Sequence, residues 1–324
     1  MKRVLNERTV VVITGASSGI GRATALQFAR RGVCLVLASR DLAGLQPVID
    51  ECLAEGARAI AVQADMQDAE AAPRIAAEAV KTFGRLDVWV NNAGVAAFGR
   101  FTETPAEAHD QVIRTNLIGY IHGAHAAMTP FLKQGEGVLI NVVSMAGWAP
   151  TPLASSYTAS KFGNRGFSEA LRVELGARAG IRVCDVHPAF VDTPMLEHVA
   201  NYSGRKLIPV PPVVAVDAVA RKIVSLAERP RDFNPMGVAF AVTVGLHSLS
   251  PRLFQWSGAR AIKAFFAFAP PAPRTDAALY AATPGGGPAV GGHRSPALRA
   301  LVGAVAVGGA AGALWLASRR YRAD

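Results

Sequence analysis

Residues Thr14-Gly-Ala-Ser-Ser-Gly-Ile-Gly21 decide the fold of this 324-residue chain. They follow an apolar, β-branched run at 9–13 and precede a helical pattern at 22–31. Glycines in such a turn let the backbone approach a pyrophosphate, and the N-terminus of the following helix offers free N–H groups and a positive dipole end. The spacing differs from Gly-x-Gly-x-x-Gly, but its place between a strand and a helix predicts a nucleotide-binding turn.

The first 190 residues alternate short apolar runs with helical patterns. The expected strands are Thr9–Thr14, Val33–Ala38, Arg58–Gln63, Leu86–Val90, Gly137–Val143 and Ile181–Val186. The expected helices are 19–31, 41–55, 68–83, 105–134, 155–179 and 214–228. This alternation predicts an α/β fold, a doubly wound parallel sheet in a single domain with helices on both faces. Ligands should therefore bind beyond the carboxyl ends of the strands.

A second group of residues has the chemistry to move a proton at neutral pH. Tyr157 and Lys161 are four residues apart and share a helix face, and Ser144 lies thirteen residues upstream. A free tyrosine titrates near ~10, and a nearby positive charge favours the phenolate, so Lys161 is expected to lower the pKa of Tyr157. The serine hydroxyl would hold a substrate oxygen. Tyr-x-x-x-Lys also occurs on ordinary surface helices, so the motif gains its meaning from the nucleotide-binding turn before it.

Taken together, these motifs resemble the short-chain dehydrogenase/reductase family, in its shorter-core branch, over about residues 8–230. They occur in the order of the family: the glycine turn 14–21, Asn91-Asn-Ala-Gly94, Asn116, Ser144, and Tyr157 with Lys161. The resemblance implies a Rossmann-like sheet. It also implies hydride transfer between a nicotinamide cofactor and an alcohol or carbonyl.

The resemblance assigns a role to each motif residue. Tyr157 would be the general acid in reduction and the base in oxidation, Lys161 would also bind the cofactor ribose, and Ser144 would steady charge on the substrate oxygen. Asn116 would bend its helix and hold a water in a proton relay to the lysine. The implied cofactor-binding residues are Gly15, Ser17, Ser18, Gly19, Ile20, Gly21, Ser39, Arg40, Asp65, Asn91, Ala93, Gly94, Tyr157, Lys161, Pro188, Val191 and Thr193.

Two departures from the family pattern bear on the cofactor. Members that use NAD usually carry an acid near the position of Ser39, which binds the ribose 2′-hydroxyl; here Arg40 follows instead. A guanidinium suits a 2′-phosphate, so the sequence favours NADP(H) over NAD(H). Asp41 is interpreted as the N-cap of the next helix. Ala189 stands where the family has glycine, and Thr193 fits the role of holding the nicotinamide amide.

The predicted substrate region is apolar. The loop 194–212 and neighbouring positions supply Met195, Leu196, Val199, Tyr202, Leu207, Ile208, Phe98, Trp148, Pro150 and Leu153. This lining favours a lipophilic alcohol or carbonyl, such as a sterol, a retinoid or a long-chain carbonyl. His187 is interpreted as structural, and the spacing of His, Cys and Asp residues suggests no metal site. The alternative function is a membrane-tethered NADP(H)-binding scaffold without turnover, against which the complete set of four catalytic residues argues.

The pattern changes after residue 230. We divide the chain into a Rossmann-like oxidoreductase domain at 1–230, an apolar and aromatic extension at 231–269, a Pro/Gly-rich linker at 270–296, and an anchoring helix with a basic tail at 297–324. The stretch 300–318 has no charge and is long enough to span a bilayer, although a frayed alanine-rich tail or a helix packed on the domain also fits it. The stretch 251–268 either enters the membrane interface or covers the core.

The charge and cysteine content narrow the partners and the compartment. The net charge of +10 is concentrated near the C-terminus among apolar residues, which favours an anionic membrane surface over nucleic acid. Three cysteines without metal spacing indicate a reducing compartment, and no secretory signal precedes the first strand. We expect a cytoplasmic active site with membrane association through 300–318. The chain lacks the Asp-Gly-Gly strand that family tetramers use, which favours a homodimer through the helices of Asn116 and Tyr157.

Overall fold

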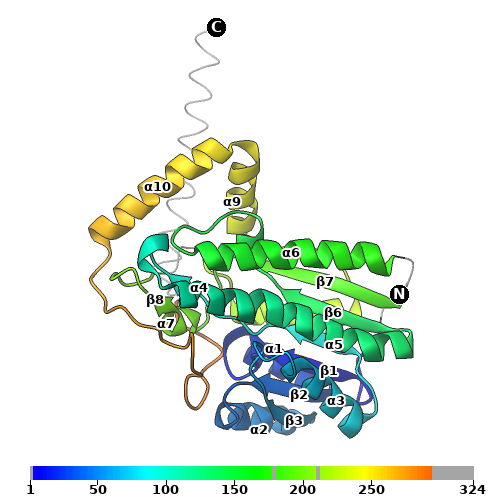
Figure 1. The fold of residues 1–324 in the computed structure, drawn as a ribbon. Helices are drawn as coiled ribbons and strands as arrows, with labels where there is room; N and C mark the ends of the chain where they lie inside the picture. Colours follow the sequence, from blue (N-terminus) through cyan, green and yellow to red (C-terminus); the bar gives the residue numbers. More distant parts are fainter. Residues whose placement is uncertain (1–2, 177–179, 209–211, 294–324) are drawn as a thin grey trace.

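A seven-stranded parallel sheet forms the centre of the computed structural model, which describes residues 3–176, 180–208 and 212–293 (Figure 1). The strand order is β3-β2-β1-β4-β6-β7-β9, and every neighbouring pair is parallel. The strands are β1 Val10–Thr14, β2 Cys34–Ser39, β3 Arg58–Gln63, β4 Val88–Asn91, β6 Gly137–Val142, β7 Ile181–Pro188 and β9 Phe233–Met236. The predicted doubly wound parallel sheet is confirmed.

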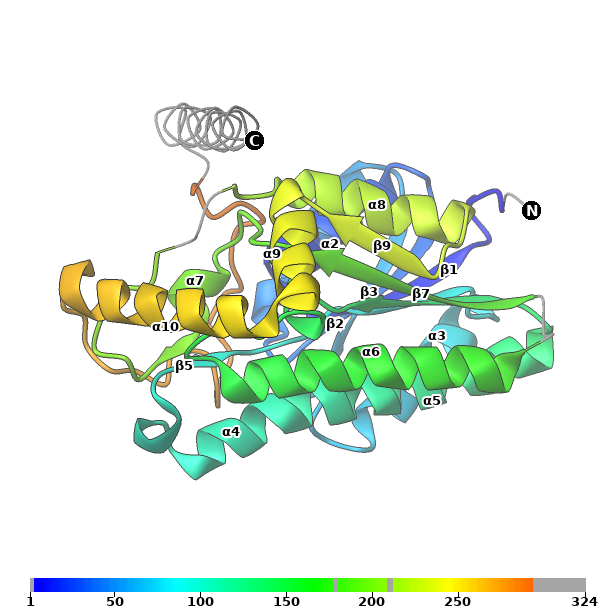
Figure 2. The same ribbon diagram turned by 90° about the horizontal axis from the view of Figure 1, so that it is seen from above.

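Helices cover both faces of this sheet (Figure 2). One core cluster joins the sheet to α1 Gly19–Ala29, α2 Gln46–Ala54 and α8 Val216–Glu228. The opposite cluster joins it to α3 Ala71–Phe83, α5 Gly119–Gln134 and α6 Ser155–Leu175. The central strands are buried on both faces, which is why they read as continuous apolar runs in the sequence.

Short helices and strands lie at the carboxyl edge of the sheet. They are η1 Ala43–Leu45, β5 Ala97–Phe98, η2 Phe101–Glu103, α4 Ala106–Ile113, η3 Arg114–Ile118, η4 Met145–Gly147, α7 Met195–His198 and β8 Ala200–Asn201. Strands β5 and β8 form a separate parallel pair. The helix predicted at 105–134 is thus three elements, because the middle one, η3, is a π-helical turn. A π-turn changes the register of a helix locally, and it lies at Asn116.

The sheet extends past residue 230, where the sequence predicted that the domain ends. Strand β9 pairs with β7 at the edge, and Asn234 Nδ2 donates a hydrogen bond to the Asp185 carbonyl at 3.1 Å. The strand contains Pro235, and proline is tolerated in a sheet mainly on edge strands. Four residues with a proline carry no periodic pattern, so this strand could not be predicted from the sequence.

Two helices, α9 Val238–Leu249 and α10 Pro251–Phe268, follow β9 and project from the domain (Figure 1). No residue of α10 is buried against the part of the chain that the structure describes. Helix α10 therefore does not cover the core. Across 3–176, 180–208 and 212–293, none of the helices combines the length and the apolar content that a membrane crossing requires. The predicted anchor at 300–318 lies outside these residues.

Residues 270–293, called the strap from here on, lie against the domain and not in solvent as a free linker would. The strap is drawn in orange in Figure 1 and runs from the end of α10 toward α1 and α2. Leu279 is fully buried, in a cluster with Ala108, Val112 and Tyr202. The Asn201 N–H donates to the Thr275 carbonyl at 2.8 Å, and the Thr275 N–H donates back to Asn201 at 3.0 Å. The strap thereby extends the small β5–β8 pair.

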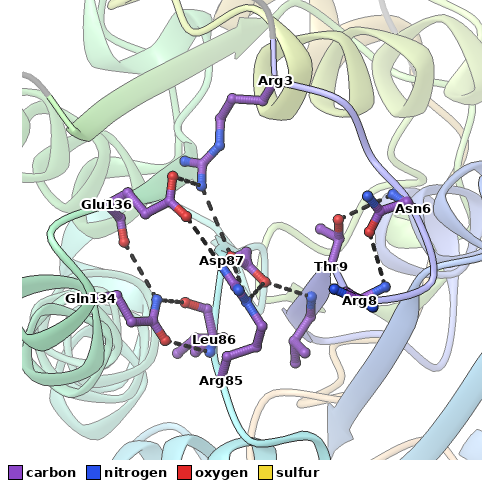
Figure 3. Close-up of polar contacts among 10 residues, drawn as sticks. Arg3, Asn6, Arg8, Thr9, Arg85, Leu86, Asp87, Gln134 and Glu136 are labelled. Carbon is purple, nitrogen blue, oxygen red and sulfur yellow. Dashed lines mark hydrogen bonds and ion pairs between the residues drawn. The ribbon is translucent and has the colours of Figure 1, made fainter.

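A polar network holds the amino edge of the sheet, opposite the ligand edge (Figure 3). Asp87 accepts a hydrogen bond from the Val10 N–H at 2.9 Å and from Arg85 Nε at 2.8 Å, and its side chain is 5% exposed. Glu136 pairs with Arg3 at 3.1 Å and with Arg85 at 3.1 Å. These contacts join the N-terminal segment to β1 and to the loops before β4 and β6.

We expect Asp87→Ala to lower the free energy of unfolding by about 2–4 kcal/mol, because a buried N–H and a guanidinium lose their acceptor together. Glu136→Gln is the matched control: its carboxylate is half exposed, so the loss should stay below about 1 kcal/mol. Urea unfolding of both variants measures the difference. Equal losses in the two variants would contradict this account of the network.

Candidate active site

A cavity of about 330 Å³ opens at the carboxyl edge of the sheet. The glycine turn, the ends of β2, β3, β4, β6 and β7, the start of α6 and the strap all contribute to its wall. The predicted site residues that line it are Gly15, Ser17, Ser18, Gly19, Ile20, Ser39, Arg40, Asp65, Ala93, Gly94, Ser144, Tyr157, Lys161, Pro188, Val191 and Thr193. Segments up to about 180 residues apart in the sequence therefore converge as the parallel sheet requires.

Close packing explains the glycines of the turn. Gly15 has φ +65°, and a Cβ there would lie 2.8 Å from the Ala93 Cα. A Cβ at Gly21 would lie 2.1 Å from the Gly15 carbonyl oxygen. The absence of a Cβ at Gly21 thus lets α1 approach the turn. Gly21 itself does not line the cavity. The turn presents its backbone and the N-terminus of α1 to the cavity, as a pyrophosphate site requires.

Asn91 was predicted to line the cofactor, and its position corrects this. Its side chain is fully buried at the end of β4, where it donates to the Tyr120 carbonyl at 3.0 Å and to Asn141 Oδ1 at 2.9 Å. The next residue, Asn92, lines the cavity and donates to the carbonyls of Thr14 and Gly15 at 2.9 and 3.0 Å. Side chains alternate along a strand, so the two asparagines face opposite sides.

The catalytic candidates meet where β6 ends and α6 begins. Lys161 and Tyr157 lie one turn apart on α6, and the Lys161 Nζ is 5.7 Å from the centre of the Tyr157 ring. Ser144 follows β6 and lies beside the Tyr157 hydroxyl, whose pKa it lowers. The Lys161 Nζ donates to the Val142 carbonyl at 3.0 Å, and the Tyr120 hydroxyl donates to the same oxygen at 3.0 Å. One carbonyl of β6 therefore positions the lysine.

Burial dominates the pKa values of this group. It lowers the pKa of the Lys161 ammonium to about 7. It also raises the pKa of the Tyr157 phenol, although the Ser144 side chain lowers it in part. The pKa of Tyr157 therefore lies above its ordinary value, contrary to the expectation that Lys161 would bring it below. A lysine with a pKa near neutrality carries only part of a positive charge at pH 7, so it stabilises the phenolate weakly.

Asn116 lies behind the cavity in the π-turn η3. Its Nδ2 donates to the Val95 carbonyl and its Oδ1 accepts from the Val95 N–H, both at 2.8 Å. Its own carbonyl accepts from Asn164 Nδ2 at 2.9 Å. The side chain thus fixes the loop after β4 to the helix that carries Asn116. The water relay implied by the resemblance stays a prediction.

Arg40 occupies the end of β2, as expected for a residue that reads the adenosine ribose. The adjacent Asp41 accepts from the N–H groups of Ala43 and Gly44, both at 3.1 Å, so it caps η1. Asp65 lines the cavity and also accepts from the Gln67 N–H at 3.1 Å. Ser39 donates to Ser17 at 3.0 Å, which joins the ribose side of the cavity to the glycine turn.

His187 is buried and does not line the cavity. Trp148 Nε1 donates to its Nδ1 at 3.2 Å, and burial lowers the pKa of the imidazole to about 4. It packs with Trp148, Phe233 and Phe240 in an aromatic cluster. His187 therefore stays neutral at physiological pH, in agreement with the structural interpretation.

The predicted substrate wall is present in part. Phe98, Met195, Leu196 and Val199 line the cavity. Trp148 instead stacks beneath Arg165, whose guanidinium carbon lies 3.5 Å from the ring centre. The residues that the sequence missed include Asn92, Met66, Thr151 and the strap positions Ala278, Ala282, Thr283 and Gly286. The strap residues carry no local sequence motif, because only the fold brings them to the carboxyl edge of the sheet.

Comparison with known proteins adds to this geometry. The model of the short chain dehydrogenase family matches residues 9–203. The uncharacterized oxidoreductase YxnA of Bacillus subtilis (strain 168) is 38% identical over 75% of this chain and 69% of its own. The 11-beta-hydroxysteroid dehydrogenase A of Sesamum indicum is 33% identical over 76% of this chain and 73% of its own.

Two solved structures are also similar. A short chain dehydrogenase/reductase from Burkholderia phymatum, in complex with NAD, has a TM-score of 0.69 and 28% identity, covering 78% of this chain and 96% of that one. An alcohol dehydrogenase from Thermococcus sibiricus, complexed with 5-hydroxy-NADP, has a TM-score of 0.61 and 26% identity, covering 70% and 94%.

The buried lysine gives stability a defined pH dependence. The folded pKa of Lys161 lies below its unfolded value of about 10.4, so the unfolded chain binds more protons between these values and stability rises with pH. Relative to Lys161→Met, the wild type should gain up to about 1.4 kcal/mol per pH unit between pH 7 and 9.5. Urea unfolding of both proteins across this range measures it. A constant difference would show that Lys161 keeps its ordinary pKa.

Proposed function

The chain belongs to the short-chain dehydrogenase family and is an oxidoreductase that acts on CH–OH donors, and from this we propose that it interconverts a lipophilic alcohol and its ketone or aldehyde with NADP(H). The observation that carries the proposal is the convergence of Ser144, Tyr157 and Lys161 at the end of the glycine-turn cavity. Ser144 and Tyr157 both line this cavity, so a group that would bind the substrate oxygen and a group that would donate a proton border the same space.

The residues of the cavity fit a nicotinamide dinucleotide. The turn allows close backbone approach at Gly15 and Gly21, and the N-terminus of α1 suits a pyrophosphate. The nicotinamide, when bound, supplies or accepts the hydride. Thr193 follows β7 and lines the cavity, and it would hold the nicotinamide amide.

The protein's own residues handle the proton and the substrate oxygen. In reduction, Tyr157 donates its proton to the oxygen as charge develops there, and Ser144 hydrogen-bonds the same oxygen. In oxidation, Tyr157 removes the hydroxyl proton. Lys161, with a pKa of about 7, exchanges protons at neutral pH and returns the phenol to its starting state.

Arg40 supports NADP(H) as the cofactor. Its guanidinium lies at the end of β2, where a 2′-phosphate would accept charge-assisted hydrogen bonds. Strand β2 ends with Ser39, where family members that use NAD usually carry an acid. Among similar solved structures, one holds NAD and the other 5-hydroxy-NADP, so both cofactor types occur in neighbours of this fold.

The apolar part of the cavity supports a lipophilic substrate. Phe98, Met195 and Leu196 line the wall beyond the catalytic residues. One relative is named as a hydroxysteroid dehydrogenase, which acts on a substrate of this class. We include sterols, retinoids and long-chain carbonyls in the proposal, and the reaction direction follows from the cofactor ratio in the cell.

Membrane association and a homodimer complete the proposal. The outer face of α10 presents Leu253, Trp256, Arg260 and Lys263, and no acidic residue occurs between 233 and 275. Such a mixture suits an anionic membrane interface, and the stretch 300–318 would add an anchor. The active site would then face the cytoplasm. Exposed apolar side chains at Ile118 on η3 and Phe162 on α6 support pairing of two copies through these helices.

Replacement of the acid tests the chemistry. We expect Tyr157→Phe to lower kcat for NADPH-dependent carbonyl reduction by about 10²–10⁴-fold, because the oxygen loses its proton donor. The dissociation constant for NADPH should change less than about threefold, since the ring remains in place. The assay follows NADPH and NADH consumption by full-length protein in detergent against lipophilic and small carbonyls. NADPH binding without turnover on any carbonyl in the wild type would favour the tethered scaffold.

Vesicle flotation tests the membrane proposal. Full-length protein should float with vesicles that contain phosphatidylserine, and the double substitution Val305→Lys and Leu314→Lys should reduce the floated fraction severalfold, because charges oppose insertion. Val173→Lys is the matched control, since Val173 is 83% exposed on α6. Wild-type protein that stays with the aqueous fraction at low and high salt would contradict membrane association.

A further inference from the structure

The strap occupies donors that the glycine turn would offer to a cofactor. The Gly19 N–H, at the first residue of α1, donates to the Pro288 carbonyl at 3.0 Å. The Gly287 N–H donates to the Ser17 carbonyl at 3.1 Å, and Arg22 donates to the Gly287 carbonyl at 2.9 Å. Backbone oxygens of residues 287 and 288 thus lie where the anion-binding end of the turn would hold phosphate oxygens.

The strap also occupies Arg40. Its guanidinium donates to the carbonyls of Ala278 at 2.6 Å, Ala281 at 3.2 Å and Leu279 at 3.3 Å. Burial lowers the pKa of this guanidinium, so the strap has removed it from much of its water. On the other side, Asp41 accepts from the Gly285 N–H at 2.7 Å. The residue that would read a 2′-phosphate is therefore already bound by neutral acceptors from the same chain.

Contacts outside the cofactor site hold the strap in place. Tyr202 donates to Asp276 at 2.5 Å, and Leu279 is fully buried. Gln111 donates to the Leu279 carbonyl at 3.0 Å. At the far end, the His293 N–H donates to Asp192 at 2.7 Å. These anchors lie at both ends of the stretch that crosses the site, which leaves the middle, around 281–288, free to lift without releasing the whole strap.

We propose that the strap is an autoinhibitory element that competes with the cofactor and that NADP(H) displaces more readily than NAD(H) does. The proposal rests on the proposed function, because it assigns the glycine turn and Arg40 to a dinucleotide. An N–H bound to a strap carbonyl is withheld from a phosphate. Charge-assisted hydrogen bonds to phosphate are stronger than bonds to neutral carbonyls, so a 2′-phosphate can take Arg40 from the strap. NAD(H) has no such group and must displace the strap with its pyrophosphate alone.

A reversible covalent lock tests the competition. A Cβ at Gly287 would lie 3.3 Å from the Ser18 Cβ, close to the ~3.5–4.5 Å of a disulfide. The full-length double variant Ser18→Cys and Gly287→Cys should bind NADPH at least about tenfold more weakly when oxidised than when reduced, because the lock holds the strap on the turn. Fluorescence titration gives both constants, and mass analysis under non-reducing conditions confirms the bond. The single variant Ser18→Cys under the same oxidant is the control, since the three native cysteines are buried.

Each outcome of the lock has one meaning. Equal or tighter NADPH binding by the oxidised form would overturn the proposal and make the strap a clamp on bound cofactor. Failure of the reduced double variant, the single variant and the wild type alike to bind NADPH would contradict the proposed function itself. Weaker binding that reverses with reductant supports autoinhibition.

A second variant tests displacement without a new bond. Leu279→Asp places a charge in a buried apolar site and should loosen the strap in the full chain. We expect the dissociation constants of both cofactors to fall at least about threefold and by a similar factor, because either cofactor must displace the same strap. Weaker binding of both cofactors, in a variant with unchanged circular dichroism, would overturn the proposal.

Discussion

The close approach of the glycine turn to strand β4 is the contact on which the active site depends. Strand β1 pairs with β2 on one side and β4 on the other, so the turn after β1 must pass against the loop after β4. Asn92 bonds to the carbonyls of Thr14 and Gly15 across this contact, and any side chain at Gly15 or Gly21 would collide. The cradle for a dinucleotide is therefore a consequence of strand order and of the absence of two Cβ atoms.

A single carbonyl connects this cradle to the chemistry. The Val142 oxygen, at the end of β6, accepts hydrogen bonds from Lys161 and from Tyr120. Helix α6 packs on the same face of the sheet as α5, which carries Tyr120. Lys161 is therefore held in a buried site where its pKa is about 7. Burial, which lowers the pKa of Lys161 to near neutrality, also raises the pKa of Tyr157. The two shifts have the same physical origin.

The C-terminal part of the chain changes the surroundings of this site. A domain that ended after β9 would leave the glycine turn and Arg40 open to solvent, whereas the strap brings backbone carbonyls to both. Helix α9 packs Phe240 against the aromatic cluster of His187, and the two helices α9 and α10 expose Leu249, Trp256 and Phe268. The extension thus contributes one segment that covers the cofactor side and another that offers an apolar, basic face.

The sequence alone determined the parallel sheet, the place of the glycine turn and the positions of Ser144, Tyr157 and Lys161. Buried strands leave continuous apolar runs, and catalytic motifs are local, so both can be read along the chain. The tertiary structure decided what depends on contacts between distant residues: that Asn92 and not Asn91 faces the cavity, that burial outweighs charge in setting the pKa of Tyr157, and that 270–293 returns to the cofactor edge. Strand β9 and the strap have no periodic pattern, because pairing with β7 and backbone bonds to Arg40 order them in place of their own propensities.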